Sequence, residues 1–129
     1  MSDKQNPEIG SITWCDLTAP NAEEVKDFYE KVVGWIPDPV SMGDYSDFSM
    51  IAPESGKVAA GICHSRGSNA KLPPQWLLYI AVKDVDESAK QCEQLGGKVI
   101  VEPKNMSGYG RYCVIQDPAG AVCALFKPE

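Results

Sequence analysis

Hydrophobic and polar positions follow the same order twice along the chain. An alternating stretch at 11–17 precedes apolar residues at helical spacing, and an equivalent pair of patterns returns about 63 residues later. Alternation indicates a strand, and a spacing of three or four residues indicates an amphipathic helix. Two copies of one module predict a pseudo-symmetric fold with a ligand cleft between its halves.

The first module is predicted to contain one strand, one helix and three further strands. Asn21 is the expected N-cap of the helix, Glu24 stands at the capping-box position, and Gly34 ends the helix. The helix residues expected to face the core are Val25, Phe28, Tyr29, Val32 and Val33. The three strands are expected at 35–40, 47–52 and 57–63.

The second module repeats this order after a stretch rich in glycine, serine and proline. A strand is predicted at 76–82, followed by a helix with Asp84 as N-cap and Glu87 at the capping-box position. The expected core positions of this helix are Val85, Ala89, Cys92 and Leu95. The closing strands are expected at 98–101, 111–116 and 121–126, with a tight turn at 117–120. We therefore predict one domain over 1–129, with modules at about 10–64 and 75–127 and a linker at 65–74.

Charge and composition narrow the classes of partner. The formal net charge is −6 and the isoelectric point is about 4.7, which disfavours nucleic acid and anionic membranes, because both require clustered basic residues. The longest apolar run, 76–82, is too short to span a bilayer, and the polar start at 1–6 lacks the apolar segment of a signal peptide. We expect a cytoplasmic protein that binds neither nucleic acid nor membrane.

The cysteines and the single histidine offer little chemistry by spacing alone. The five cysteines are an odd number and form no CxxC pair, which favours reduced thiols acting as small apolar groups. Cys63 and His64 are adjacent, but neighbouring residues of a strand point to opposite faces. His64 ends a predicted strand at the linker and is expected to be a surface residue.

Two motifs carry a resemblance to a known family. The helix segment Phe-Tyr-Glu-Lys-Val-Val-Gly-Trp at 28–35 and the closing Gly-Arg-Tyr-Cys-Val-Ile-Gln-Asp-Pro-Ala-Gly at 110–120 resemble the vicinal oxygen chelate superfamily, which includes glyoxalase I, extradiol dioxygenases and bleomycin-resistance proteins. The resemblance covers essentially the whole chain. It implies an α+β fold in which two βαβββ modules form an open, curved, β-barrel-like sheet with helices outside. It also implies a ligand cavity and a homodimer.

The resemblance also implies where a metal would bind, and this chain departs from that pattern. Metal-dependent members place His or Glu on the first strand of each module and Glu on the last. The corresponding residues here are Trp14, Leu77, Ala124 and one near Gly61, none of which supplies a metal ligand. A slip of one residue adds only Cys15 as a plausible ligand. We therefore expect no metal and no cofactor, and the best-known activities of the superfamily are disfavoured.

Strand parity suggests which side chains would line a cavity. Trp14, Asp16 and Thr18 share one face of the first strand, and Leu77, Tyr79 and Ala81 share one face of the equivalent strand. An indole, a phenol and a carboxylate suit an aromatic or cationic ligand. Arg111 is the candidate partner of Asp16. The predicted ligand-binding residues are Trp14, Asp16, Tyr79 and Arg111. Equally, the two aromatic residues could be ordinary core, and Asp16 could be solvated or structurally paired.

Two functional classes therefore remain, and a third is a further alternative. The first is a metal-free protein, similar to bleomycin-resistance members, that binds a small organic ligand. The second is an enzyme of the same superfamily, of lyase, isomerase or dioxygenase type. It would use an atypical metal site with Cys15, His64 or a cavity carboxylate, or metal-free acid–base chemistry through Asp16 or Tyr79. The third is an interaction domain.

Overall fold

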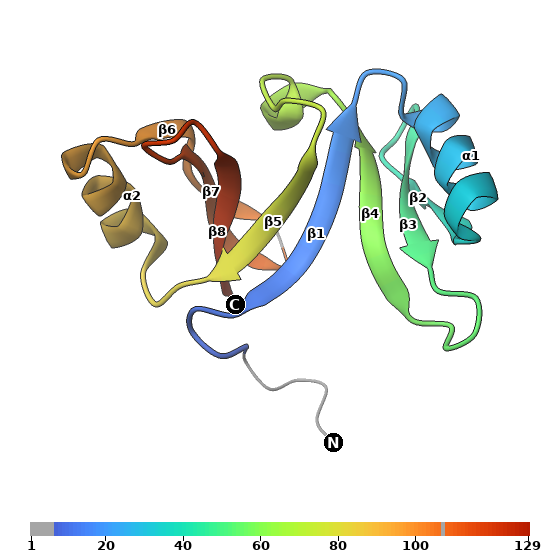
Figure 1. Cartoon of the computed structure of the whole chain (residues 1–129), viewed down its shortest axis with the longest axis horizontal. Helices are drawn as coiled ribbons and strands as arrows, with labels where there is room; N and C mark the ends of the chain where they lie inside the picture. Colours follow the sequence, from blue (N-terminus) through green and yellow to red (C-terminus); the bar gives the residue numbers. More distant parts are fainter. Residues whose placement is uncertain (1–6, 107) are drawn as a thin grey trace. The chain divides into compact units, whose positions relative to one another are not determined.

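The computed structural model describes residues 7–106 and 108–129, with the side chain of Ser68 left out. The polar start of the chain at 1–6 lies outside the described residues. The chain divides into two compact units, one formed by Cys15–Trp76 and the other by residues 7–14 with 77–129 (Figure 1). Neither helix of the described residues is long and apolar enough to cross a membrane.

The unit of residues 15–76 contains one helix and a four-stranded mixed sheet. Its elements are β1 (Ile12–Ala19), α1 (Ala22–Val33), β2 (Ile36–Ser41), β3 (Ser46–Ile51), β4 (Val58–His64) and a 3₁₀ turn, η1 (Gly67–Asn69). The strand order is β2-β3-β4-β1. β4 and β1 run parallel, while β3 is antiparallel to both β2 and β4.

The other unit repeats this topology. Its elements are β5 (Trp76–Ala81), α2 (Val85–Gln94), β6 (Lys98–Met106), β7 (Gly110–Gln116) and β8 (Val122–Pro128), in the order β5-β8-β7-β6. β5 and β8 are parallel, and β7 is antiparallel to its two neighbours. Asp16 pairs with Gly61 in one ladder and Tyr79 pairs with Ala124 in the other. These four residues occupy equivalent positions, which confirms the α+β class and the repeated βαβββ module.

The start of the described chain belongs to the second unit. Gly10 donates its backbone N–H to the carbonyl of Ala81 at 2.7 Å, and Ala81 donates to the carbonyl of Ser11 at 2.9 Å. The Thr13 hydroxyl donates to the carbonyl of Tyr79 at 3.3 Å. Residues 10–13 therefore extend along β5, and the boundary between the compact units falls within β1 as well as after the linker.

One strand is longer than its sequence pattern predicts. β6 runs from Lys98 to Met106, although its alternation predicted 98–101. Its pairing with β7 shifts register between Val101 and Lys104, around Pro103. Because β6 is the last strand in its sheet order, Pro103 can lack an N–H without breaking a second ladder. Pro103 therefore interrupts the hydrophobic alternation of the sequence without ending β6.

The two helices begin differently. The Asp84 carboxylate accepts the backbone N–H of Glu87 at 3.0 Å, which confirms the predicted cap of α2. Asn21 makes no such bond, and its side-chain amide instead donates to the Glu24 carboxylate at 3.0 Å. The predicted capping box of α1 is therefore wrong. The backbone of Asn21, with φ −110° and ψ 51°, lies outside the extended region that an N-cap usually adopts.

Each unit has its own apolar core. Ala22, Phe48, Met50 and Ile62 form one, and Val85, Ala89, Cys113 and Leu125 form the other. Several helix residues predicted to be core are instead exposed: Phe28, Val32, Val33 and Leu95. The last three lie at the C-terminal ends of their helices, where the apolar spacing continues but the packed core does not. α1 contacts its core through Ala22, with Val25 and Tyr29 beside it.

Candidate functional site

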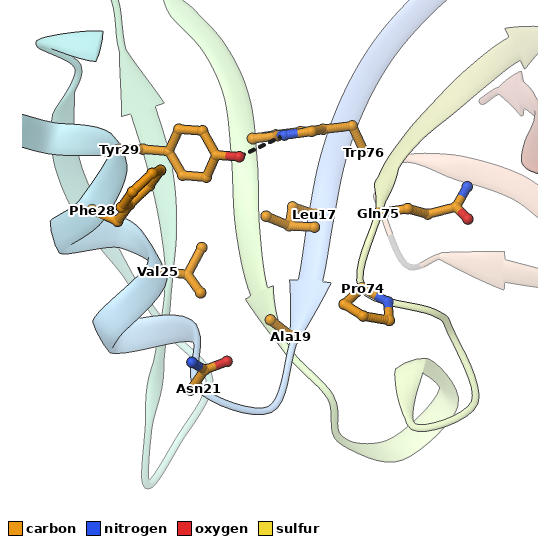
Figure 2. Close-up of a pocket in the computed structure, with 9 residues that line it drawn as sticks. All are labelled: Leu17, Ala19, Asn21, Val25, Phe28, Tyr29, Pro74, Gln75 and Trp76. Atoms are coloured by element: carbon orange, nitrogen blue, oxygen red, sulfur yellow. Dashed lines mark hydrogen bonds between the residues drawn. The ribbon is translucent and has the colours of Figure 1, made fainter. Parts of the chain in front are cut away.

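A pocket of about 290 Å³ lies within the unit of residues 15–76 (Figure 2). Three segments form it: the end of β1, the inner side of α1, and the chain that leads into β5. Its lining residues are Leu17, Ala19, Asn21, Val25, Phe28, Tyr29, Pro74, Gln75 and Trp76. All nine are uncharged. The pocket therefore offers apolar and aromatic surface with two side-chain amides.

An aromatic cluster forms one wall of this pocket. The indole Nε1–H of Trp76 donates to the hydroxyl of Tyr29 at 3.0 Å, and the two rings meet edge to face at 5.2 Å (Figure 2). Trp35 packs 5.8 Å from each ring, and Phe28 meets Tyr29 edge to face at 5.1 Å. Edge-to-face packing and the hydrogen bond both fix the orientation of the rings in this wall.

The pocket uses the opposite face of β1 from the one that parity assigned to a cavity. Leu17 lines the pocket beside α1, as predicted for a residue packing toward the helices. Trp14 and Asp16 alternate with Leu17 along the strand, and both are half-buried. Tyr79 is also half-buried, on β5 opposite Ala124. A binding role for Trp14, Asp16 and Tyr79 stays a prediction.

Arg111 has a carboxylate partner on α2. Its Nε and Nη2 donate to the two oxygens of Asp86, each at 2.8 Å, and its Nη1 donates to the Asn105 side chain at 3.1 Å. The hydrogen bond from Arg111 lowers the pKa of Asp86 below its usual value. The guanidinium thus joins β7 to the first turn of α2, and its predicted contact with Asp16 stays a prediction.

His64 is not the surface residue expected from the sequence. Only 12% of its side chain is exposed, and its Nδ1 lies 3.1 Å from Oδ1 of Asp47. The same oxygen accepts the backbone N–H of His64 at 2.9 Å. The expectation was wrong because Asp47, 17 residues earlier on β3, holds the end of β4 in place.

The five cysteines are free thiols. Burial raises the pKa of Cys63 above its usual range, and the nearby charges of Asp16 and Asp47 raise it further. Burial also raises the pKa of Cys113 to about 12. Both thiols stay protonated at neutral pH, and a nucleophilic role requires the thiolate.

The residues at the metal positions of the resembled family do not fit a metal ion. Trp14, Leu77, Gly61 and Ala124 carry no metal-binding atom in their side chains, and the ladder partners of the last two, Asp16 and Tyr79, add one carboxylate and one phenol. Across residues 7–106 and 108–129, no three His, Cys, Asp or Glu side chains gather in a way that could hold a metal.

Comparison with known proteins identifies the family. The sequence model of the Glyoxalase/Bleomycin resistance protein/Dioxygenase superfamily matches residues 11–125. The chain is 32% identical to the anthracycline biosynthesis protein DnrV of Streptomyces peucetius, across 92% of this chain and 47% of that protein. The chain thus spans about half the length of the curated relatives it matches.

Solved structures share the fold at lower identity. Methylmalonyl-CoA epimerase from Mycobacterium tuberculosis matches with a TM-score of 0.55 and 18% identity, across 93% of this chain and 88% of that one. Homoprotocatechuate 2,3-dioxygenase from B. fuscum matches with a TM-score of 0.57 and 18% identity, across 98% of this chain and 34% of that one. These two likenesses establish the fold alone. The family model, which matches most of the chain, identifies it as a member of the Glyoxalase/Bleomycin resistance protein/Dioxygenase superfamily.

Proposed function

We propose that this protein binds a small organic ligand with a flat aromatic surface, without a metal ion. The observation that carries the proposal is the pocket beside α1, where Trp76 and Tyr29 are held edge to face by a hydrogen bond. Its volume of about 290 Å³ is at the lower end of ligand sites, and suits a molecule of one or two rings.

The chemistry of the lining sets the expected ligand class. A ligand that covers Leu17, Val25 and the aromatic rings removes apolar surface from water, which favours binding. An ionised group on the ligand would lose its hydration and find no charged side chain among the lining residues. The amides of Asn21 and Gln75 can each donate or accept one hydrogen bond to a hydroxyl or carbonyl of the ligand. A neutral aromatic molecule with one polar substituent fits best.

The relatives and the metal positions support the same class. One curated relative is named an anthracycline biosynthesis protein, and anthracyclines contain fused aromatic rings. Trp14, Leu77, Gly61 and Ala124 occupy the positions where the resembled family would bind a metal, and their side chains offer it no ligand. A homodimer, which the family resemblance implies, and a cytoplasmic location are part of the proposal.

Binding of 2-naphthol, followed by tryptophan fluorescence and calorimetry, tests the proposal. Trp76→Leu removes both the ring and the hydrogen bond donor, and we expect it to weaken binding about fivefold, since a stacked aromatic contact contributes roughly 1 kcal/mol beyond its buried area. Trp14→Leu is the matched control, because Trp14 lies outside the pocket lining. Cyclohexanol, which has no aromatic ring, should bind more weakly than 2-naphthol.

The same pair of variants separates the pocket from the cavity predicted by strand parity. If Trp14→Leu weakens binding and Trp76→Leu does not, the ligand binds at the face of Trp14 and Asp16, and the pocket assignment is wrong. If 2-naphthol and cyclohexanol bind equally, the aromatic specificity is wrong. The alternative function is that this protein is an enzyme of the lyase, isomerase or dioxygenase type found in the same superfamily.

A further inference from the structure

A half-buried Asp–His pair lies outside the aromatic pocket. Asp47 is on β3 and His64 is the last residue of β4, and 13% and 12% of their side chains are exposed. One carboxylate oxygen of Asp47 contacts both the imidazole Nδ1 at 3.1 Å and the backbone N–H of His64 at 2.9 Å. The two contacts hold the histidine backbone and its ring at one place.

The β3–β4 hairpin creates this arrangement. The antiparallel ladder pairs Phe48 with Ile62, so Asp47 continues alongside the last residues of β4. The backbone N–H and the imidazole Nδ1 of His64 therefore both contact one oxygen of this carboxylate.

This geometry defines the protonation pattern of the imidazole. An ionised carboxylate can only accept a hydrogen bond, so Nδ1 of His64 carries the hydrogen and Nε2 of the neutral ring keeps a lone pair. A carboxylate placed in this way orients a histidine and stabilises its protonated form when it accepts a proton. The pair therefore has the components of a general base and acid.

The Tyr45 ring that contacts His64 also contacts a positive charge. The Tyr45 ring meets the His64 imidazole edge to face, with 5.1 Å between the ring centroids. The guanidinium of Arg66 stacks over the Tyr45 ring, 4.0 Å from its centroid. Arg66 also lies 3.8 Å from Asp44, whose side chain is 87% exposed, so this ion pair is weak. Arg66 can exchange it for an anionic group of a bound molecule.

We propose that His64, positioned by Asp47, transfers a proton to or from a small organic carboxylate that Arg66 holds. Nε2 of His64 takes the proton from a C–H or O–H bond, and the bonding electron pair stays on the substrate atom. The imidazolium then returns the proton, so the step needs no oxidant or reductant. This site shares no residue with the pocket lining, and it is independent of the proposed aromatic ligand.

The Kemp elimination of 5-nitrobenzisoxazole tests the proton transfer. The base removes the ring C–H proton, the electron pair forms a nitrile, and the N–O bond breaks to release a coloured phenolate. We expect the protein to react about 100-fold faster than free imidazole at equal concentration, since a positioned base contributes on the order of 10²–10⁴. His64→Gln should reduce the rate to that of the buffer. A wild-type rate equal to that of imidazole, or no loss in the variant, would overturn the proposal.

Benzoate and benzamide, as inhibitors of this reaction, test the carboxylate assignment. The two molecules have similar shape, so stronger inhibition by benzoate reports its charge. Arg66→Gln should remove the difference, whereas Lys71→Gln, which removes an equal charge from another exposed position, should keep it. Equal inhibition by benzoate and benzamide in the wild-type protein would show that Arg66 does not hold a carboxylate.

The role of Asp47 has a spectroscopic signature, because the chain contains one histidine. Imidazole ¹⁵N shifts should show hydrogen on Nδ1 in the neutral wild-type protein. Asp47→Asn keeps the size of the side chain but removes its charge, and should lower both this preference and the elimination rate. Circular dichroism confirms that the variant is folded. A folded variant with unchanged tautomer and rate would refute the positioning role.

Discussion

The closing motif of the chain begins with a glycine that the packing of β7 against β8 requires. Gly110 has φ +146°, a backbone conformation that residues with a side chain rarely adopt. A Cβ placed there would contact the carbonyl oxygen of Lys127 and lie 2.8 Å from the Cα of Pro128. Because Gly110 pairs with Pro128 in the ladder, the β8 backbone cannot move away without weakening its own pairing. We therefore predict that Gly110→Ala destabilises the fold strongly.

The expected cost has two parts. An unfavourable backbone conformation costs about 1 kcal/mol, and overpacking against a backbone that cannot relax costs about 1–3 kcal/mol. The free energy of unfolding should therefore fall by about 3 kcal/mol. With a urea m-value of roughly 1–3 kcal/mol/M, the unfolding midpoint should fall by at least about 1 M.

Gly120→Ala is the matched control for this experiment. Gly120 also has a positive φ, +94°, but the nearest atom to a Cβ there is a flexible side-chain nitrogen of Gln116 at 3.9 Å. The free energy of unfolding of Gly120→Ala should fall only by the cost of the unfavourable backbone conformation, about 1 kcal/mol. Urea unfolding followed by circular dichroism measures both variants. Equal losses in Gly110→Ala and Gly120→Ala would refute the packing argument.

Three further predictions concern stability. Asp84→Ala should lower the free energy of unfolding by about 1 kcal/mol, because it removes the side-chain cap of α2. Asn21→Ala should lower it less, because the Asn21 side chain caps no backbone N–H of α1. Urea unfolding compares the two variants. Ile62→Val, at a fully buried site, should cost about 1 kcal/mol by the same assay. The hydrogen bond from Arg111 lowers the pKa of Asp86 below its ordinary value of 3.8. The contribution of this ion pair to folding stability is therefore present above pH 3.8 and is lost as the pH falls through the lowered pKa. Asp86→Asn should therefore lower the melting temperature at neutral pH, and a difference that persists undiminished in strong acid would contradict this linkage.

Local signals determined most of the secondary structure. Gly34, with φ +90°, ends α1 where the sequence predicts it, and the Asp84 side chain caps α2. In the turn after β7, the Asp117 side chain accepts the backbone N–H groups of Ala119 and Ala121. These features depend on residues within a few positions of each other, so composition and spacing are enough to predict them.

Burial at the helix ends could not be read from spacing alone. Val33 and Leu95 continue the apolar periodicity of their helices, yet 50% and 72% of these residues are exposed. Periodicity reports which way a side chain points, while burial depends on whether another element lies there to cover it. The short cores of the two units end before these last turns.

The repeated module, the family resemblance and the alternation that turns Leu17 toward α1 all follow from the order of the amino acids. The side-chain partners that make up the candidate sites depend instead on tertiary packing. Trp76 meets Tyr29 across 47 residues, and Asp47 meets His64 across 17. Such contacts depend on how strands and helices pack, which no local pattern encodes, because a hydrogen bond needs its atoms placed within a few tenths of an ångström.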